Sequence, residues 1–363
     1  MHSYLSDGEL AGKSLLDIDS DRLDFGLDAL RRGARRAVVL LPDPERALAA
    51  RAAADSLGTQ AEIIASEFEG WTTDERFDIV RCNALHQMYD PIHALRRMVE
   101  LVRETVVLEL AEPGFASVRA GHIGARALLA RGAPAIFLGD PKMSTNVFLL
   151  TSEALRVFFN KHYACFEPIA VARVQDRTIV KARLRKIDTL TIVAGPTSSG
   201  KSTFVQHLCD DAALRRSHEL GEISHVTSGN KLYALPCGEL RHVLFHYDLL
   251  RPFGRRLRNY SRDPALTLLR AARSVNVFTI ITPRDRLRAQ LKEADLRRRL
   301  PRTRHQDGHQ ELYRRYGEPE FLRAWYERWF DFCAAAAVRR HTVVEHTGTY
   351  RFVPAQQWRN AQL

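Results

Sequence analysis

The sequence LTIVAGPTSSGKSTF, residues 190–204, decides the fold of the C-terminal half. It leads from an apolar strand into a helix through a turn that matches the pattern GxxxxGK[ST]. Such a turn directs successive backbone N–H groups, and the positive end of the helix, at phosphate oxygens. We therefore predict a phosphate-binding loop made of Gly195, Pro196, Thr197, Ser198, Ser199, Gly200, Lys201, Ser202 and Thr203.

Two residues of this loop carry the predicted chemistry. Lys201 is expected to reach the β and γ phosphates of bound ATP or GTP, and the Ser202 hydroxyl to ligate a bridging Mg²⁺ ion. A glycine-rich turn without function is the alternative. The flanking strand and helix argue against it, because the mechanism requires both.

An acidic residue ends the next apolar strand, HVLFHYD, residues 242–248. We predict that Asp248 lies beside the loop and orients an acceptor hydroxyl, deprotonates it, or holds the metal. The alternative is that Asp248 only caps the helix that follows, as Asp commonly does. The sequence leaves both open.

Arginines follow the strand VNVFTII, residues 275–281. Arg284 and Arg288 are predicted to neutralise charge that develops during transfer, in a mobile region that continues through residues 297–304. Alternatively, each of these arginines is a solvated or salt-bridged surface residue without a role in transfer. Aromatic residues further on recur at helical spacing, which predicts core packing: Phe321, Trp325, Tyr326, Trp329 and Phe330.

The strand, loop, acid and arginine-rich region together resemble those of the small P-loop kinases. The resemblance implies transfer of the ATP γ-phosphate to a hydroxyl of a small molecule or glycan. A nucleotide-dependent ATPase or switch with a scaffold domain is an alternative. A regulatory GTPase is disfavoured, because the only string similar to NKxD contains Asn230 and Lys231 without the aspartate.

Strands and helices also alternate in the first half, which predicts a mainly parallel sheet covered by helices. The expected strands are KSLLDID, AVVLL, FDIVRC and ETVVLEL, with helical sequences between them. Charged residues at KARLRKID precede the new apolar strand of the C-terminal half. We therefore predict an α/β protein with two domains, residues 1–185 and 186–363.

The segment FDIVRCNALHQMYDPIHALRRMVELVRETVVLELAE, residues 77–112, resembles the Rossmann-like methyltransferases that use S-adenosylmethionine (SAM). The resemblance extends over about the first 180 residues. It implies a fourth strand at residues 77–82, a loop beside the substrate at 86–91, and the next strand at 105–109.

The expected cofactor loop departs from this family. Asp19, Asp21 and Leu23 stand where the family has glycines or small residues, so side chains occupy the path of the cofactor. The family's ribose-binding acid corresponds to Leu41 or Pro42. We therefore predict a degenerate domain that keeps the fold and has lost, or nearly lost, SAM binding.

An active methyltransferase is the alternative, with Asp17 and Asp43 contacting SAM and His86 near the acceptor. Alternatively, His86 is an ordinary loop residue without a catalytic role. A bifunctional enzyme that methylates and phosphorylates a polysaccharide end is a further alternative, which rests on the pairing of domains alone.

Composition limits the partners. The net charge is +11, with many arginines after residue 250, which favours an anionic ligand; nucleic acid is disfavoured because no recognition motif accompanies the charge. Five scattered cysteines argue against a zinc site or a disulfide framework. With no long apolar run and no secretion signal, we expect a cytoplasmic protein without a membrane span. The sequence predicts no oligomeric state.

Overall fold

The computed structural model describes residues 4–18, 24–110, 128, 131–138, 148–174, 177–250, 259–297, 304–336 and 338–362. The chain divides into two compact units. The N-terminal unit comprises Met1–His162 and Phe166–Leu184, and the C-terminal unit comprises Tyr163–Cys165 and Arg185–Leu363. Each is an α/β structure, and each is described by itself.

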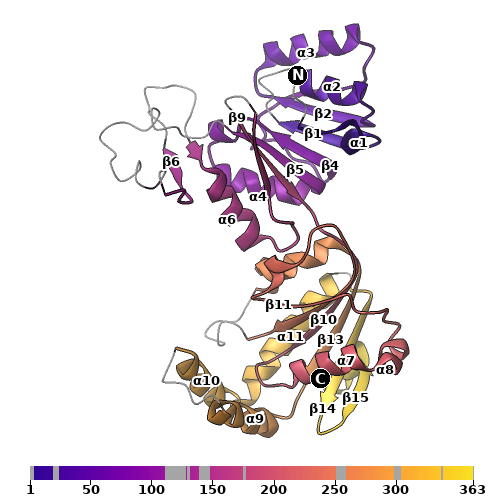
Figure 1. The fold of residues 1–363 in the computed structure, drawn as a ribbon, viewed down its shortest axis with the longest axis vertical. Coiled ribbons are helices and arrows are strands. Elements are labelled where there is room, and N and C mark those ends of the chain that lie inside the picture. The colour runs from indigo at the N-terminus through magenta and orange to yellow at the C-terminus, as the bar shows by residue number, and fades with distance from the viewer. Residues whose placement is uncertain are drawn as a thin grey trace. The chain divides into compact units, whose positions relative to one another are not determined.

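The N-terminal unit is built on a mixed sheet with the strand order β3-β2-β1-β4-β5-β9-β8 (Figure 1). The strands from β3 to β5 are parallel, whereas β9 and β8 run antiparallel to their neighbours. The strands are β1 (Ser14–Ile18), β2 (Arg36–Leu41), β3 (Glu62–Ala65), β4 (Phe77–Cys82), β5 (Val102–Leu110), β8 (Ala170–Val174) and β9 (Arg177–Arg183). A separate hairpin pairs β6 (Ile136–Leu138) with β7 (Phe148–Leu150).

Helices connect these strands, and their first turns are capped by side chains. Asp43 accepts hydrogen bonds from backbone N–H groups in the first turn of α3, and Asp90 does the same for α4. Both helices begin with proline, whose missing N–H costs nothing at that position. The helices are α1 (Asp7–Leu10), α2 (Asp24–Arg31), α3 (Pro44–Ser56), α4 (Pro91–Leu101) and α6 (Ser152–His162), with a 3₁₀ turn η1 (Leu85–Gln87).

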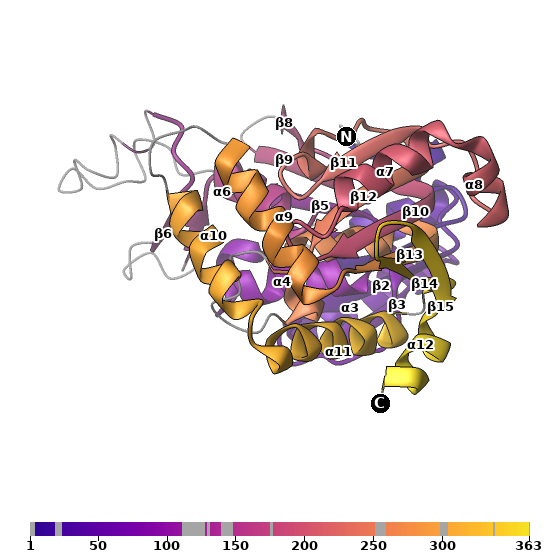
Figure 2. The same cartoon turned by 90° about the horizontal axis from the view of Figure 1, so that it is seen from below.

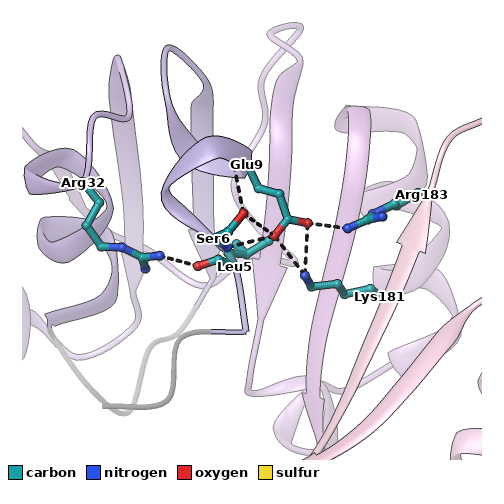
Figure 3. A network of polar contacts seen from close by, with 6 residues as sticks. All are labelled: Leu5, Ser6, Glu9, Arg32, Lys181 and Arg183. Atoms are coloured by element: carbon teal, nitrogen blue, oxygen red, sulfur yellow. Dashed lines mark hydrogen bonds and ion pairs between the residues drawn. The ribbon is translucent and has the colours of Figure 1, made fainter.

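Polar contacts join the N-terminal segment around α1 to β9 and to Arg32 (Figure 3). Ser6 and Glu9 form a capping box at α1. The Glu9 carboxylate accepts a hydrogen bond from Lys181 Nζ at 3.1 Å and also pairs with Arg183, so that α1 is tied to β9. On the other side, Arg32 donates to the Leu5 carbonyl and to Asp7. The contacts join chain segments that are far apart in sequence.

The C-terminal unit has a sheet with the strand order β11-β12-β10-β13-β14-β15, in which only β15 is antiparallel to its neighbour (Figure 1). β10 lies between β12 and β13, in register with both. The strands are β10 (Lys186–Gly195), β11 (His225–Ser228), β12 (Glu239–Asp248), β13 (Ala272–Ile281), β14 (Arg340–His346) and β15 (Tyr350–Pro354).

Helices of the C-terminal unit pack on this sheet, and Figure 2 shows α9 and α10 next to each other. The helices are α7 (Lys201–Asp210), α8 (Ala212–Ser217), α9 (Arg284–Arg297), α10 (Arg304–Arg315), α11 (Pro319–Ala335) and α12 (Ala355–Gln362). The 3₁₀ helices are η2 (Leu232–Ala234), η3 (Tyr260–Arg262) and η4 (Pro264–Ala271). In the described part of the chain, no helix has the length and hydropathy needed to span a bilayer.

The spacing of the aromatic residues of α11 predicted core packing, which holds for four of the five, whereas Phe321 is half-buried. Trp325, Tyr326, Trp329 and Phe330 are buried. The Trp329 indole N–H donates to Thr279 Oγ1 at 2.9 Å, and the Tyr326 hydroxyl donates to a β13 carbonyl. These bonds satisfy the buried polar atoms of Trp329 and Tyr326, whereas the indole nitrogen of Trp325 has no hydrogen-bond partner among the described residues.

Candidate functional site

The order of the strands reverses beside β1 in the N-terminal unit. β2 and β3 lie on one side of β1, and β4 and β5 lie on the other. In open α/β sheets, ligands bind outside the carboxyl ends of the strands at such a reversal. The residues that follow β2 and β4 are therefore the candidates for ligand contacts.

Asn83 and His86 follow β4, and both are buried. The Asn83 side-chain oxygen has no hydrogen-bond partner among the described residues, which is costly for a buried amide. His86 lies in η1, where its Nε2 is 3.3 Å from the Gln87 amide nitrogen. Asp43 follows β2, and its Oδ1 accepts both bonds that cap α3. The cofactor-loop residues 19, 21 and 23 lie outside the described residues.

Asp17 is fully buried and paired with Arg81, whose Nη1 is 2.6 Å from Asp17 Oδ1. Arg81 also donates to Glu109 at 2.9 Å and to the Tyr4 hydroxyl at 2.5 Å, and its guanidinium stacks 4.3 Å from the Phe25 ring. Burial raises the pKa of Asp17, and Arg81 opposes that shift. Arg81 thus pairs with Oδ1 of Asp17, whereas Oδ2 has no hydrogen-bond partner among the described residues, and a contact of Asp17 with SAM stays a prediction.

In the C-terminal unit, residues 195–203 connect the carboxyl end of β10 to α7, again where the strand order reverses. Ser198 and Gly200 both have left-handed backbone conformations, with φ of 65° and 87°. Lys201 is buried, and its Nζ donates to the Pro196 carbonyl at 2.5 Å. Ser202 and Thr203 are exposed in the first turn of α7.

Asp248 ends β12 directly opposite Gly195 of β10. Its Oδ2 accepts a hydrogen bond from the Thr197 hydroxyl at 2.8 Å and lies 3.7 Å from Lys201 Nζ. Its Oδ1 accepts from the Leu250 backbone N–H at 2.9 Å, as in a turn. The structure thus brings Asp248 and Lys201 together, and a chemical role for Asp248 stays a prediction.

The two predicted arginines lie apart from these contacts. Arg284 is exposed at the first residue of α9. Arg288 stacks on the Tyr313 ring, with its guanidinium carbon 4.5 Å from the ring centroid. Residues 298–303 of the arginine-rich region lie outside the described residues. Among the described residues, no group of three or more His, Cys, Asp or Glu side chains could hold a metal ion.

Three residues that sequence reasoning missed contact the 195–203 segment. Thr282 and His346 are both within hydrogen-bond distance of the Ser199 carbonyl, and the Tyr316 hydroxyl donates to the Thr197 carbonyl at 2.9 Å. His346 ends β14, so the strand-end rule applied to Asp248 could have found it. No local pattern marks Tyr316.

Comparison with known proteins identifies relatives of the fold only. No protein-family model and no curated protein matches the sequence. Among solved structures, a 1,6-didemethyltoxoflavin-N1-methyltransferase from Burkholderia thailandensis is 15% identical, covering 48% of this chain and 72% of its own, with a TM-score of 0.35. A magnesium protoporphyrin IX methyltransferase from Synechocystis is 12% identical, with coverages of 49% and 77% and a TM-score of 0.36. The N-methyltransferase NodS from Bradyrhizobium japonicum is 14% identical, with coverages of 48% and 79% and a TM-score of 0.33.

These structures match the N-terminal half, which resembles their Rossmann-like fold, and each contains bound S-adenosylhomocysteine. The finding contradicts the predicted function: the assignment as a P-loop kinase that uses ATP and Mg²⁺ is wrong, because the matched proteins are methyltransferases. The alternative of a nucleotide-dependent ATPase or switch also has no support from these structures. The same holds for the phosphorylation step of the proposed bifunctional enzyme. The matches also give no support to a loss of SAM binding.

Proposed function

We propose that the N-terminal unit binds SAM at the carboxyl ends of β1, β2 and β4 and transfers its methyl group to a small-molecule acceptor. The observation that carries this proposal is Asn83, a buried amide at the reversal of strand order whose oxygen has no partner among the described residues. A buried acceptor left without a hydrogen bond costs about 1–3 kcal/mol. A ligand that donates a hydrogen bond there removes that cost.

Three residues of this unit have roles in the proposal. Asn83 accepts a hydrogen bond from the cofactor, and Asp43 offers Oδ2 to its ribose hydroxyls, since both capping bonds fall on Oδ1. His86, buried just after β4, lies on the acceptor side. SAM itself supplies an electrophilic methyl group on a sulfonium. The protein therefore needs only to orient the two reactants and exclude water.

Calorimetric titration with S-adenosylhomocysteine tests the binding. The unchanged chain is expected to bind, and Asn83→Ala to bind about tenfold more weakly, because one buried hydrogen bond is lost. Gln60→Ala is the control, since Gln60 is exposed just before β3, at the amino ends of the strands. Failure of the unchanged chain to bind, or equal binding by Asn83→Ala, contradicts the proposal.

Transfer is tested with SAM labelled on its methyl group, incubated with the full chain and a fractionated small-molecule extract. Label is expected in an organic product with the unchanged chain and with Gln60→Ala, and much less of it with Asn83→Ala. Binding without labelled product would restrict the N-terminal unit to cofactor binding and would contradict the transfer step.

We propose a second function for the C-terminal unit, in which residues 195–203 bind a phosphate group of a phosphorylated ligand. The supporting observation is the combination of two left-handed residues, Ser198 and Gly200, with the buried Lys201 at the start of α7. Successive N–H groups in such a turn form a concave site for an anion. Lys201 supplies the balancing charge.

Inorganic pyrophosphate is the probe for this second function. Lys201→Met is expected to weaken its binding by about tenfold to a hundredfold, because a charged hydrogen bond is lost. Lys186→Met is the matched control, since Lys186 begins the same strand β10 at its opposite end and is exposed. Equal effects of the two substitutions would reduce the binding to net charge and contradict the site.

A further inference from the structure

The carbonyl oxygen of Ser199 is held by two side chains from neighbouring strands. Thr282, which follows β13, donates its hydroxyl to this oxygen at 3.0 Å. His346, which ends β14, places its Nδ1 at 3.2 Å from the same oxygen. Ser199, Thr282 and His346 are all buried, so solvent does not compete for these bonds.

Holding this carbonyl fixes the direction of the next amide. In a trans peptide the C=O and the N–H of the following residue point in opposite directions. The Gly200 N–H therefore points away from Thr282 and His346. Gly200 also has no room for a side chain, because a Cβ would lie 2.8 Å from the His346 ring.

Arg286 determines which ring nitrogen of His346 carries the proton. Its Nη2 lies 3.3 Å from His346 Nε2. A guanidinium can only donate, so Nε2 must accept, which places the imidazole proton on Nδ1, facing the Ser199 carbonyl. Burial lowers the pKa of His346, and Arg286 lowers it further, although the Ser199 carbonyl opposes this shift. This lowering of the pKa favours the neutral imidazole.

We propose that Thr282 and His346 are positioning residues that direct the Gly200 N–H at a phosphorylated ligand, and that Arg286 acts through His346 by fixing its tautomer. The inference rests on the proposed phosphate binding by residues 195–203. According to this inference, residues at the ends of β13 and β14 and on α9 also shape that site. Among the arginines of α9, only Arg286 is assigned a role, which it exerts through His346.

Pyrophosphate titration of the full chain tests the positioning. Thr282→Val and His346→Leu are each expected to weaken binding by about threefold to tenfold, since each removes one hydrogen bond that orients the amide. Thr282→Ser retains the hydroxyl and should restore most of the affinity. Lys292→Gln, an exposed position on α9, is the control. Variants that bind as the unchanged chain does would overturn the inference.

A double-mutant cycle tests the route through His346. Arg286→Gln is expected to weaken pyrophosphate binding in the unchanged chain and to add no further loss in the His346→Leu background. Additive losses would show that Arg286 acts on the ligand independently, and would overturn that part of the proposal.

Nuclear magnetic resonance of the free protein provides a readout without ligand. The imidazole ¹⁵N shifts should place the proton on Nδ1 of His346, and the Gly200 amide signal should move in Thr282→Val and in His346→Leu. A proton on Nε2 overturns the inference whatever the binding results. If the unchanged chain does not bind pyrophosphate, the phosphate site itself is contradicted. If the unchanged chain binds and Thr282→Val and His346→Leu bind equally well, only the positioning is contradicted.

Discussion

Arg81 neutralises two carboxylates in the interior of the N-terminal unit. It is buried against Asp17 and Glu109, at 2.6 Å and 2.9 Å, whereas Arg177 lies 3.9 Å from Glu109. Replacing it with an apolar residue leaves Asp17 buried without its counter-charge. Removing one partner of a buried ion pair costs about 3–5 kcal/mol, far more than losing a surface pair.

Arg81→Leu is therefore expected to lower the free energy of unfolding by about 3–5 kcal/mol at pH 8. Burial raises the pKa of Asp17, and without Arg81 that shift grows, so the folded variant binds a proton more readily than the unfolded chain. The loss should accordingly be smaller at pH 5 than at pH 8. Urea unfolding at both pH values measures it, with the exposed Arg76→Leu as control. A loss that does not depend on pH would contradict the predicted burial of the Asp17 charge.

Gly200→Ala is expected to lower the free energy of unfolding by more than the 1–2 kcal/mol or so that a left-handed alanine costs. The new methyl group also meets the His346 ring. Gly238→Ala is a matched control, because Gly238 has a similar φ of 91° and a Cβ there meets nothing within 4 Å. Thermal unfolding compares the two. Equal losses would show that His346 moves aside at no cost.

Sequence reasoning at the residue level worked where a local pattern exists. The GxxxxGK[ST] pattern located the turn that joins β10 to α7, and the strand-end rule located Asp248 beside it. The Arg81–Asp17 pair escaped prediction, because it depends on β1 and β4 pairing in register, and no spacing in the sequence encodes that pairing.

Helix α1 is too short to be stable alone, so its contacts with β9 and Arg32 must hold it in place. Although burial raises the pKa of Glu9, the Ser6 backbone N–H, Lys181 and Arg183 lower it to about 2. A depressed carboxylate pKa stabilises the fold above the pKa of the unfolded chain. That stabilisation is lost as the pH falls toward about 2.

Glu9→Gln is expected to lower the free energy of unfolding by up to about 1 kcal/mol at pH 7, since the pairs are partly exposed. The difference from the unchanged chain should shrink at pH 3. Asp74→Asn, at an exposed position in the same unit, should have little effect at either pH. Scanning calorimetry measures the shifts, and an effect at pH 3 as large as at pH 7 would contradict the charge assignment.

Prediction of elements succeeded for long apolar strands and failed for short polar ones. FDIVRC was predicted as a strand and is β4 with the same bounds. The strand β11, with the sequence HVTS, was missed because it has no apolar run, and β15, with the sequence YRFVP, was missed because it ends in proline. Both are edge strands whose pairing depends on a neighbour already in place.

At the scale of the whole molecule, the α/β class and the methyltransferase-like architecture of the first half were predicted from the sequence, and the activity was not. The kinase prediction extended one local turn to a complete reaction. A phosphate-binding turn specifies where N–H groups point, and folds that contain one host many chemistries. The comparisons concern only the fold of the N-terminal half.

Each unit has one proposed ligand, which binds at the reversal of strand order in its sheet. Hydrogen–deuterium exchange of the full chain, with S-adenosylhomocysteine and separately with pyrophosphate, tests this assignment most directly. S-adenosylhomocysteine is expected to slow exchange in peptides that contain the ends of β2 and β4, and pyrophosphate in peptides that contain residues 195–204. Protection by S-adenosylhomocysteine elsewhere, or nowhere, would contradict the central claim.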